Sequence, residues 1–474
     1  MELSRRFATS LPELGSQVTP TLLKNQNLVM VNHDHARELR CPDDWWQNNG
    51  ITQLLGDPDS VLSGGAMAQK YGGHQFGYWN PDLGDGRGLL LGEAQHQDGT
   101  YHDLHLKGAG QTPYSRFADG RAVLRSTLRE YIGSEAMHAL GVPSSRSLCL
   151  FTSDETVLRE QPESGAMMIR TAPSHIRFGH FEYFFHAKAP QKLNALMTYT
   201  LEHHFPECLS AANPPAALLN AITLRTARLI ALWQSLGFVH GVMNTDNMSV
   251  HGITFDYGPY AFMDAFNASA VFNHSDEQGR YAFDQQPGVA LWNLNMLAYA
   301  FTDHCSVDEI KAALSQFEPV FLQQYGHLMR RRLGLNDTPQ SQALIDRWLS
   351  MLSSQQRDYT HSFRLLARSD LTDTTSFVRD HFLDRDAFDA WWHDYRALRL
   401  DSDVPQSALL TTNPAVIPRT HLLADAIAQA ETGDFVLADT LFRAVTSPYD
   451  SQWDAHPFAA VPTGTHEVSL SCSS

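Results

Sequence analysis

Residues 237–247 read Gly-Phe-Val-His-Gly-Val-Met-Asn-Thr-Asp-Asn, and residues 255–258 read Phe-Asp-Tyr-Gly. Apolar residues at helical spacing predict a helix over Ala216–Leu236 that ends at the glycine, and a short apolar strand and a polar loop follow it. The loop closes on an acid and an amide, and Asn247 stands nine residues before Asp256. An amide oxygen and a carboxylate at the ends of a short hairpin can bind one Mg²⁺ beside a triphosphate.

A glycine-rich segment lies upstream, where residues 84–88 read Gly-Asp-Gly-Arg-Gly just before a strand predicted over Leu89–Gln95. Glycines such as Gly84 and Gly86 let backbone N–H groups approach a phosphate closely, and Arg87 would add positive charge. Because glycine-rich turns are common, a plain hairpin turn is the alternative interpretation of this segment.

A lysine ends the next predicted strand, Tyr101–Lys107, on the side opposite its last leucines. From there Lys107 can reach the phosphates of a bound nucleotide. Glu130 follows 23 residues later in a helix predicted over Arg121–Leu140, where Asp119 is the expected cap, and it can hold the lysine ammonium in place. The alternative is an ordinary lysine at the end of a strand.

The character of the predicted elements changes near residue 190. Residues 1–60 look irregular, and the further strands before residue 190 are predicted over Ser147–Thr152, Glu155–Glu160 and Ala166–Thr171. Helices are predicted beyond that point, over Gln191–Phe205, Ala216–Leu236 and most of 289–446. The order indicates an α+β protein with two lobes. We expect an N-terminal extension (1–60), a β-rich nucleotide-binding lobe (61–188), an enlarged helical lobe with the loop and metal site (189–446), and a C-terminal tail (447–474) with Cys472.

The composition limits the classes of function. The chain has 474 residues, of which 43% are hydrophobic, and its formal net charge is −17. A field of that sign repels phosphate backbones, so we expect no nucleic-acid partner, although a local basic pocket for one small anion is compatible with it. The sequence shows no run of 18 apolar residues and no signal peptide, which predicts a cytoplasmic protein with no membrane partner.

The five cysteines are scattered, and the 23 histidines show no third ligand at helical or hairpin spacing, so neither set predicts a metal site. Four of the cysteines are predicted to be buried, reduced thiols. Cys472 stands third from the end of a polar tail, where burial is not expected, and a reactive thiol is the alternative there.

Taken together, a lysine, a helix glutamate, a His-Gly loop ending in Asn, and an Asp-aromatic-Gly resemble the protein-kinase-like fold. Residues His240–Asn247 match the kinase-like loop in length; Asn247 falls on the metal-binding Asn of that loop, and Asp256 falls on the metal-binding Asp of the Asp-aromatic-Gly motif. Val242 stands where a kinase has its catalytic aspartate. Because a valine cannot accept the proton of an attacking hydroxyl, this departure argues against ordinary phosphoryl transfer.

Longer strings are similar to the signature of the selenoprotein O (YdiU) family, and the similarity covers nearly the whole chain. They are residues 71–77 (Tyr-Gly-Gly-His-Gln-Phe-Gly), 80–87 (Asn-Pro-x-Leu-Gly-Asp-Gly-Arg), 106–116 (Leu-Lys-Gly-Ala-Gly-Gln-Thr-Pro-Tyr-Ser-Arg), 176–182 (Ile-Arg-Phe-Gly-His-Phe-Glu), 241–248 (Gly-Val-Met-Asn-Thr-Asp-Asn-Met), 255–259 (Phe-Asp-Tyr-Gly-Pro) and 413–419 (Asn-Pro-Ala-Val-Ile-Pro-Arg).

This resemblance implies an enzyme that transfers AMP from ATP to Ser, Thr or Tyr hydroxyls of proteins. The nucleotide would lie reversed relative to a kinase, so that its α-phosphate faces the acceptor. Asp246 would replace the missing base, and the metal would be Mg²⁺ or Mn²⁺. The residues implied for ATP are Gly84, Gly86, Arg87, Lys107, Asp119, Gly120, Arg170, Arg177 and Asp256, with Glu130 paired to the lysine and with Asn247 and Asp256 as metal ligands.

The chemistry of these residues agrees with such a scheme. Two guanidinium groups and a divalent ion suit the charge that develops on a pyrophosphate leaving group. From the residues alone, however, Arg170 and Arg177 would be interpreted as salt-bridged residues of a surface strand, and Asp246 as the cap of a turn.

The residues are also compatible with three other functions: transfer of UMP with Mn²⁺, an atypical kinase that uses Asp246 as its base, and a non-catalytic nucleotide-binding scaffold. A scaffold gains nothing from a full metal site, which argues against the last. The family also implies redox control at the position of Cys472. No motif selects the base of the nucleotide, and the sequence identifies neither the target proteins nor the oligomeric state.

Overall fold

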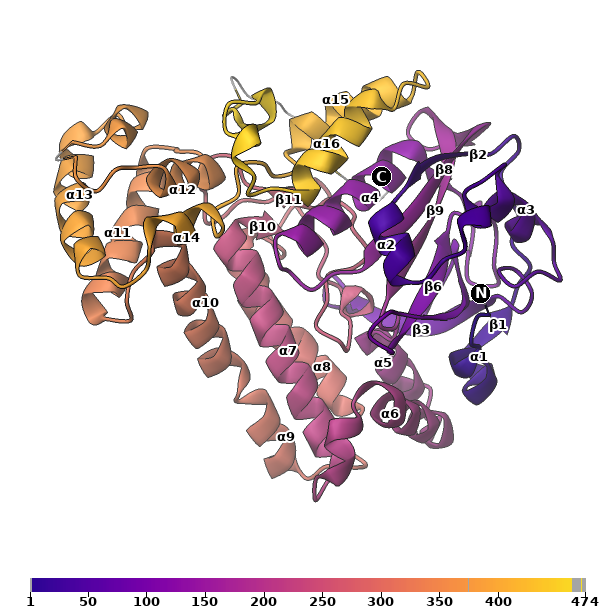
Figure 1. Cartoon of the computed structure of the whole chain (residues 1–474). Coiled ribbons are helices and arrows are strands. Elements are labelled where there is room, and N and C mark those ends of the chain that lie inside the picture. The colour runs from indigo at the N-terminus through magenta and orange to yellow at the C-terminus, as the bar shows by residue number, and fades with distance from the viewer. Residues whose placement is uncertain (1, 374, 463–469, 471–474) are drawn as a thin grey trace.

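The computed structural model describes residues 2–373, 375–462 and 470. It is a mixed α/β structure in which one large antiparallel sheet lies beside many helices (Figure 1). Within the described residues the sheet has nine strands in the order β1-β3-β5-β6-β9-β8-β2, with β4 paired to β3 and β7 paired to β9. These strands are β1 (Gly15–Gln17), β2 (Asn27–Val31), β3 (Met67–Gln75), β4 (Tyr78–Gly84), β5 (Gly88–Gln95), β6 (Tyr101–Lys107), β7 (Ala122–Val123), β8 (Arg146–Leu158) and β9 (Pro162–Ala172).

Most of the chain after the sheet is helical, and α7 crosses the centre of the molecule in Figure 1. A two-stranded hairpin of β10 (Phe238–Val239) and β11 (Ala261–Phe262) follows it. The longer helices are α4 (Leu124–Ala139), α5 (Phe178–His186), α6 (Pro190–His204), α7 (Pro214–Leu236), α8 (Gln286–Tyr299), α9 (Val307–Leu314), α10 (Phe317–Leu333), α11 (Pro339–Ser354), α12 (Tyr359–Ala367), α13 (Arg385–Leu400), α15 (Thr420–Ala430) and α16 (Val436–Thr446). The short ones are α1 (Arg6–Ser10), α2 (His33–Glu38), α3 (Gly50–Gly56) and α14 (Gln406–Leu410).

The end of the helical part returns to the sheet. Helices α15 and α16 pack on α4, and α4 packs on β8 and β9 (Figure 1). One hydrophobic core therefore joins sheet residues such as Leu150 and Met168 to residues near the end of the chain such as Leu441. Burial of this apolar surface fixes the sheet against the helices that carry the loop at 240–258.

The strand predictions succeed where hydrophobic alternation is clear. The strand predicted over Tyr101–Lys107 is β6 with the same bounds. The expectation that residues 1–60 are irregular is wrong, because β1 pairs with β3 and β2 pairs with β8. Strands β3 and β4 also escaped prediction. In β3, Gly72 and Gly73 interrupt the alternation, and a Cβ on Gly72 would lie 2.5 Å from the ring of Trp79.

Of two predicted helix boundaries, one is confirmed and one is wrong. Helix α7 ends at Leu236, as predicted, because Gly237 takes the left-handed conformation (φ 70°) that closes a helix. Helix α4, in contrast, begins at Leu124 rather than Arg121, and Asp119 does not cap it. Residues 122–123 form strand β7 instead, which pairs with β9.

Among the described residues, α7 is long and apolar enough to cross a membrane by length and composition alone. Its apolar side chains lie in the main hydrophobic core, where Leu218, Ile222 and Trp233 are buried. The helix contacts α8, α9 and α10. The structure therefore explains its hydrophobicity as that of a core helix.

Candidate active site

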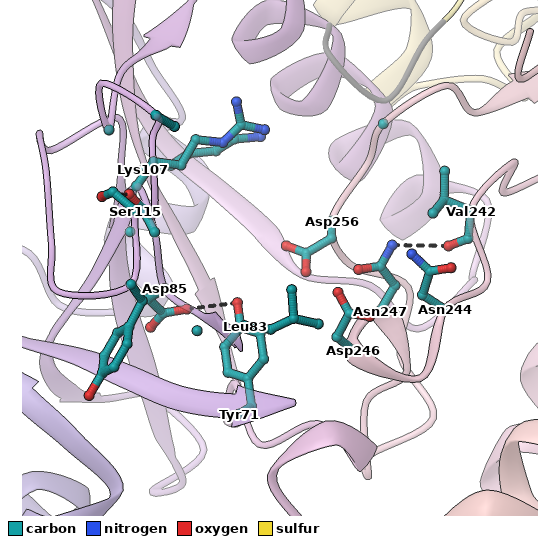
Figure 2. Close-up of a pocket in the computed structure, with 18 of the residues that line it drawn as sticks. Tyr71, Leu83, Asp85, Lys107, Ser115, Val242, Asn244, Asp246, Asn247 and Asp256 are labelled. Atoms are coloured by element: carbon teal, nitrogen blue, oxygen red, sulfur yellow. Dashed lines mark hydrogen bonds between the residues drawn. The ribbon is translucent and has the colours of Figure 1, made fainter. Parts of the chain in front are cut away.

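A cavity of about 700 Å³ lies between the sheet and the loop that follows α7. We define its sheet wall as the lining residues 83–121 with Arg159 and Arg170, and its loop wall as the lining residues 242–259. Figure 2 shows Asp85, Lys107 and Ser115 on one side and Val242, Asn244, Asp246 and Asn247 on the other, with the Asp256 carboxylate pointing into the space between them.

The cavity brings together nearly all of the residues that the sequence singles out. Glu130 lies behind the sheet wall, in contact with Lys107. Cys472 lies outside the described residues. The predicted residues that line the cavity are Gly84, Gly86, Arg87, Lys107, Asp119, Gly120, Arg170, Arg177, Asp246, Asn247 and Asp256.

Lys107 ends β6 and donates a hydrogen bond to Glu130 of α4. The other carboxylate oxygen of Glu130 accepts a hydrogen bond from Arg170 Nη1 of β9 at 2.9 Å. Burial lowers the pKa of Lys107, while the attraction of Glu130 raises it. Burial alone would raise the pKa of Glu130, but Lys107 and Arg170 hold it below its ordinary value. Two buried cations thus share one buried anion.

Asp256 stands between two arginines. Arg170 Nη1 donates to its Oδ1, and Arg177 Nη1 donates to its Oδ2. Although burial opposes ionisation, Arg177 and Arg170 hold the pKa of Asp256 well below its ordinary value. The Arg177 guanidinium also lies 4.5 Å and 4.6 Å from the ring centroids of Tyr71 and Phe255, which fixes its plane.

The backbone of Asp256 adopts a left-handed conformation, with φ 60°. A residue with a Cβ at this φ costs of order 1–3 kcal/mol, and such residues persist where the surroundings hold them. The following residue supplies one such restraint, because the buried Tyr257 hydroxyl hydrogen-bonds Ser144. The carboxylate is therefore aimed into the cavity by both its backbone and its arginines.

The loop wall is built on the β10–β11 hairpin. Asn247 Nδ2 donates to the carbonyl oxygen of Val242 at 3.0 Å, which leaves the amide oxygen of Asn247 for another partner (Figure 2). Arg177 Nη1 donates to the backbone oxygen of Asp246 at 2.6 Å. The loop His240–Asn247 is thus closed by one hydrogen bond within it and held by one from Arg177 outside it.

Asp246 is the most isolated acid of the site. Its side chain is 8% exposed, and its Oδ1 has no hydrogen-bond partner among the residues that the structure describes. Gln75 Nε2 donates to Oδ2 at 3.4 Å. Burial raises the pKa of Asp246 to about 7, and the attraction of Arg177 opposes that rise. A carboxyl of this kind can take up a proton near neutral pH.

The glycine-rich turn joins β4 to β5 and packs on the loop at 108–121. A Cβ on Gly84 would lie 2.6 Å from the ring of Tyr114, so the close approach needs a glycine. Thr112 Oγ1 donates to the backbone oxygen of Asp85 at 2.7 Å. In the same loop Asp119 accepts hydrogen bonds of 2.8 Å and 3.0 Å from Arg159.

The cavity is basic although the chain is acidic. Seven of its lining residues are Arg or Lys and four are Asp, whereas the whole chain has a net charge of −17. Opposite charge attracts a polyphosphate to this place on an otherwise repelling surface.

Sequence reasoning missed several residues of the site. Asp85 is buried and accepts from Gln69 N at 3.0 Å, and it hydrogen-bonds His105 Nε2 at 3.2 Å. His105 shares a strand face with Lys107, two residues away, and that spacing could have indicated it. Tyr71 and Gln75 lie in the string 71–77, which could have indicated them, whereas Arg159 reaches the cavity through tertiary contacts without a comparable local signal.

Similarity to known proteins identifies the class of the protein. A family model described as "Protein adenylyltransferase SelO" matches residues 1–446. "Protein nucleotidyltransferase YdiU" of Pseudoalteromonas atlantica is 50% identical over 481 residues and covers 100% of both chains. The YdiU proteins of Klebsiella pneumoniae subsp. pneumoniae (43%, 100% of both chains) and Yersinia pseudotuberculosis serotype O:1b (44%, 100% of this chain and 99% of the relative) are also similar. The protein is therefore an enzyme, a nucleotidyltransferase.

More particularly, the chain belongs to the SelO family. This confirms the family that the longer sequence strings predict. A nucleotide substrate and a divalent metal follow from that class of enzyme.

Proposed function

We propose that the enzyme transfers AMP from ATP to the hydroxyl groups of Ser, Thr or Tyr in other proteins and releases pyrophosphate. The observation that carries the proposal is the position of the acid on the loop wall. Val242 has no group that accepts a proton, whereas Asp246 is a carboxyl with a pKa raised by burial to about 7. The base at position 246 instead of 242 suits a reaction at the α-phosphorus instead of the γ-phosphorus, as expected for ATP bound in reverse relative to a kinase.

In this proposal the basic side chains that line the cavity hold the phosphates of ATP. Lys107, kept in place by Glu130, contributes an ammonium, and Arg170 and Arg177 contribute guanidinium groups that match phosphate oxygens. The turn at Gly84, Gly86 and Arg87 brings the backbone close to the phosphates, Arg87 adds charge, and Asp119 and Gly120 line the nucleotide site.

Asn247 and Asp256 are the residues proposed to hold Mg²⁺ or Mn²⁺. Their donor oxygens are hard ligands of the type that these ions prefer. Asn247 offers its amide oxygen because its nitrogen is used by Val242. Each oxygen of Asp256 has one arginine partner, and a carboxylate oxygen can accept a second. When bound, the ion neutralises charge on the phosphates and on the departing pyrophosphate.

The transfer step uses Asp246 as a general base. Its carboxylate takes the proton of the acceptor hydroxyl while that oxygen forms a bond to the α-phosphorus. The bond between the α-phosphorus and the bridging oxygen breaks, and pyrophosphate leaves with the bonding electrons. Arg170 and Arg177 then face growing negative charge on the leaving group, and guanidinium groups stabilise it.

We extend the proposal to the architecture. The lysine–glutamate pair facing an Asn–Asp loop supports a kinase-like fold of two lobes, with a β-rich lobe (61–188) after an N-terminal extension (1–60) and an enlarged helical lobe (189–446) before a tail (447–474). Redox control through Cys472 and a cytoplasmic location belong to the same proposal.

The test uses ATP labelled at either the α- or the γ-phosphate, with Mg²⁺ or Mn²⁺, and follows label on protein. We expect α-label on protein that depends on the metal and is lost by more than about a thousandfold in Asp256→Ala and Asp246→Asn. Label from the γ-phosphate would show an atypical kinase. A stronger signal from α-labelled UTP would show UMP transfer, and no label from any nucleotide would favour a scaffold.

A further inference from the structure

The end of strand β3 lies against the loop that carries Asp246. His74 N donates to Thr245 Oγ1 at 2.7 Å, and Phe76 N donates to Asn244 Oδ1 at 3.2 Å. His74 belongs to β3 and Phe76 to the turn that follows it. Both backbone N–H groups therefore bind the loop residues directly before Asp246.

The turn that follows β3 is strained. Phe76 has φ 50° and Gly77 has φ 88°, as the two central residues of a tight hairpin turn require. A glycine takes this conformation freely, but a phenylalanine does so at a cost. The Phe76 ring lies 5.1 Å from the ring of Tyr281, whose hydroxyl donates to Asn244 Oδ1 at 2.6 Å. Contacts with the loop side of the cavity thus hold the turn.

Gly73 leaves room for the Asp246 carboxyl. A Cβ on Gly73 would lie 2.7 Å from Asp246 Oδ1 and 2.9 Å from Asp246 Cβ. Real Cβ atoms do not approach other atoms this closely, so the packing needs a glycine at this position. The backbone of β3 therefore forms the floor beneath the acid.

Gln75 completes the arrangement. Its Nε2 donates to Asp246 Oδ2 at 3.4 Å, and its Oε1 accepts a hydrogen bond from Asn80 Nδ2 of β4 at 3.0 Å. The Asn80 amide nitrogen is a donor only, so the Gln75 oxygen must face Asn80. The Gln75 nitrogen therefore faces the acid. A chain of two hydrogen bonds thus connects the hairpin to Asp246.

We infer that Gln75 is a positioning residue that orients the Asp246 carboxyl toward the acceptor hydroxyl, with Gly73 and Asn80 supporting it. The inference rests on the proposed function, in which Asp246 is the base. A donor on Oδ2 and the β3 backbone beneath Oδ1 fix the carboxyl plane. Strand β3 then belongs to the acceptor side of the reaction, whereas β5, β6 and β9 belong to the nucleotide side.

The experiment compares kcat for AMP transfer with the Kd of a non-hydrolysable ATP analogue in four variants. For Gln75→Ala we expect kcat to fall about tenfold, since one long hydrogen bond to a charged group is lost, with Kd unchanged within about twofold. Gln75→Glu keeps the shape but not the donor, so kcat should fall at least as much. Gly73→Ala should cause the largest loss, and Asn80→Ala about threefold.

Gln95→Ala is the matched control, because Gln95 is an exposed residue of β5 away from the cavity, and it should leave both quantities unchanged. An unchanged kcat in both Gln75→Ala and Gly73→Ala would overturn the inference. So would an equal loss in nucleotide affinity, because Gln75 would then serve the nucleotide and not the base. If Asp246→Asn kept full transfer activity, the proposed function itself would fail, whatever Gln75 does.

Discussion

The two walls of the cavity are held in different ways. On the sheet wall, charges hold one another: Lys107 and Arg170 share Glu130, and Arg170 also reaches Asp256. On the loop wall, the Asp246 carboxyl accepts a hydrogen bond from the Gln75 amide and packs against the backbone of Gly73, which has no Cβ.

This difference follows from what each wall has to do. Cations that are paired behind the cavity can stay charged while buried, and they are then available to a polyphosphate. An acid with few polar partners instead keeps a high affinity for protons, and a base needs that affinity. We expect substitutions in the sheet wall to act by leaving buried charges unpaired. Substitutions beside Asp246 should act by moving its carboxyl.

The largest effect on stability should come from Glu130→Gln, which removes the anion shared by two cations of the sheet wall. Lys107 and Arg170 would remain buried with less compensation, and breaking a buried ion pair costs about 3–5 kcal/mol. Since Asp256 still pairs with Arg170, we expect the lower end, about 3 kcal/mol of unfolding free energy by urea titration. We also expect kcat/KM for ATP to fall about a hundredfold.

Glu207→Gln is the matched control for this change, because the Glu207 side chain is 57% exposed and its pair with Arg225 should matter by less than about 1 kcal/mol. Equal stability losses in the two variants would contradict the idea that mutual pairing holds the sheet wall.

The sequence could predict the sheet-wall pair because its members are chemically distinctive and lie on well-patterned elements. Lys107 ends a strand with clear alternation, and Glu130 lies on a helix with clear periodicity. Asn247 and Asp256 were predictable for a similar reason, since they follow a helix that ends at Gly237.

The positioning of Asp246 could not be predicted in this way. Strand β3 carries Gly72 and Gly73 where an alternating pattern would show, and glycine signals a turn before it signals a strand. The contact of Gln75 with Asp246 spans 171 residues, and the contacts of Asp256 with its arginines span 86 and 79. Only the assembled fold brings such residues together, and a local pattern carries no information about them.

Acid should weaken the sheet side of the molecule. Burial, assisted by His96, lowers the pKa of His102 on β6 to about 4, and burial, assisted by Arg177, lowers that of His180 on α5 to about 3. In the unfolded chain these imidazoles take up protons below about pH 6.5, whereas in the folded protein they stay neutral. The unfolding free energy should therefore fall below about pH 6.5, by roughly 1.4 kcal/mol per pH unit for each histidine.

Urea titrations between pH 8 and pH 5 measure this slope. In His102→Gln the slope should decrease by the contribution of one histidine. A slope that is the same in His102→Gln as in the unsubstituted protein would show that this imidazole takes up a proton in the folded state.

The smallest effect should come from Asp119→Ala, at the outer edge of the sheet wall. Asp119 pairs with Arg159 as Glu130 pairs with Lys107, but its side chain is 42% exposed. Exposed pairs contribute up to about 1 kcal/mol, so stability should change little.

The freed Arg159 guanidinium still lines the cavity and can meet a phosphate directly, which offsets the lost contact. We therefore expect KM for ATP to change by less than about fivefold, with kcat unchanged. A loss of fiftyfold or more would mean that Asp119 does more than line the nucleotide site, and that its carboxylate makes a strong contact with the nucleotide.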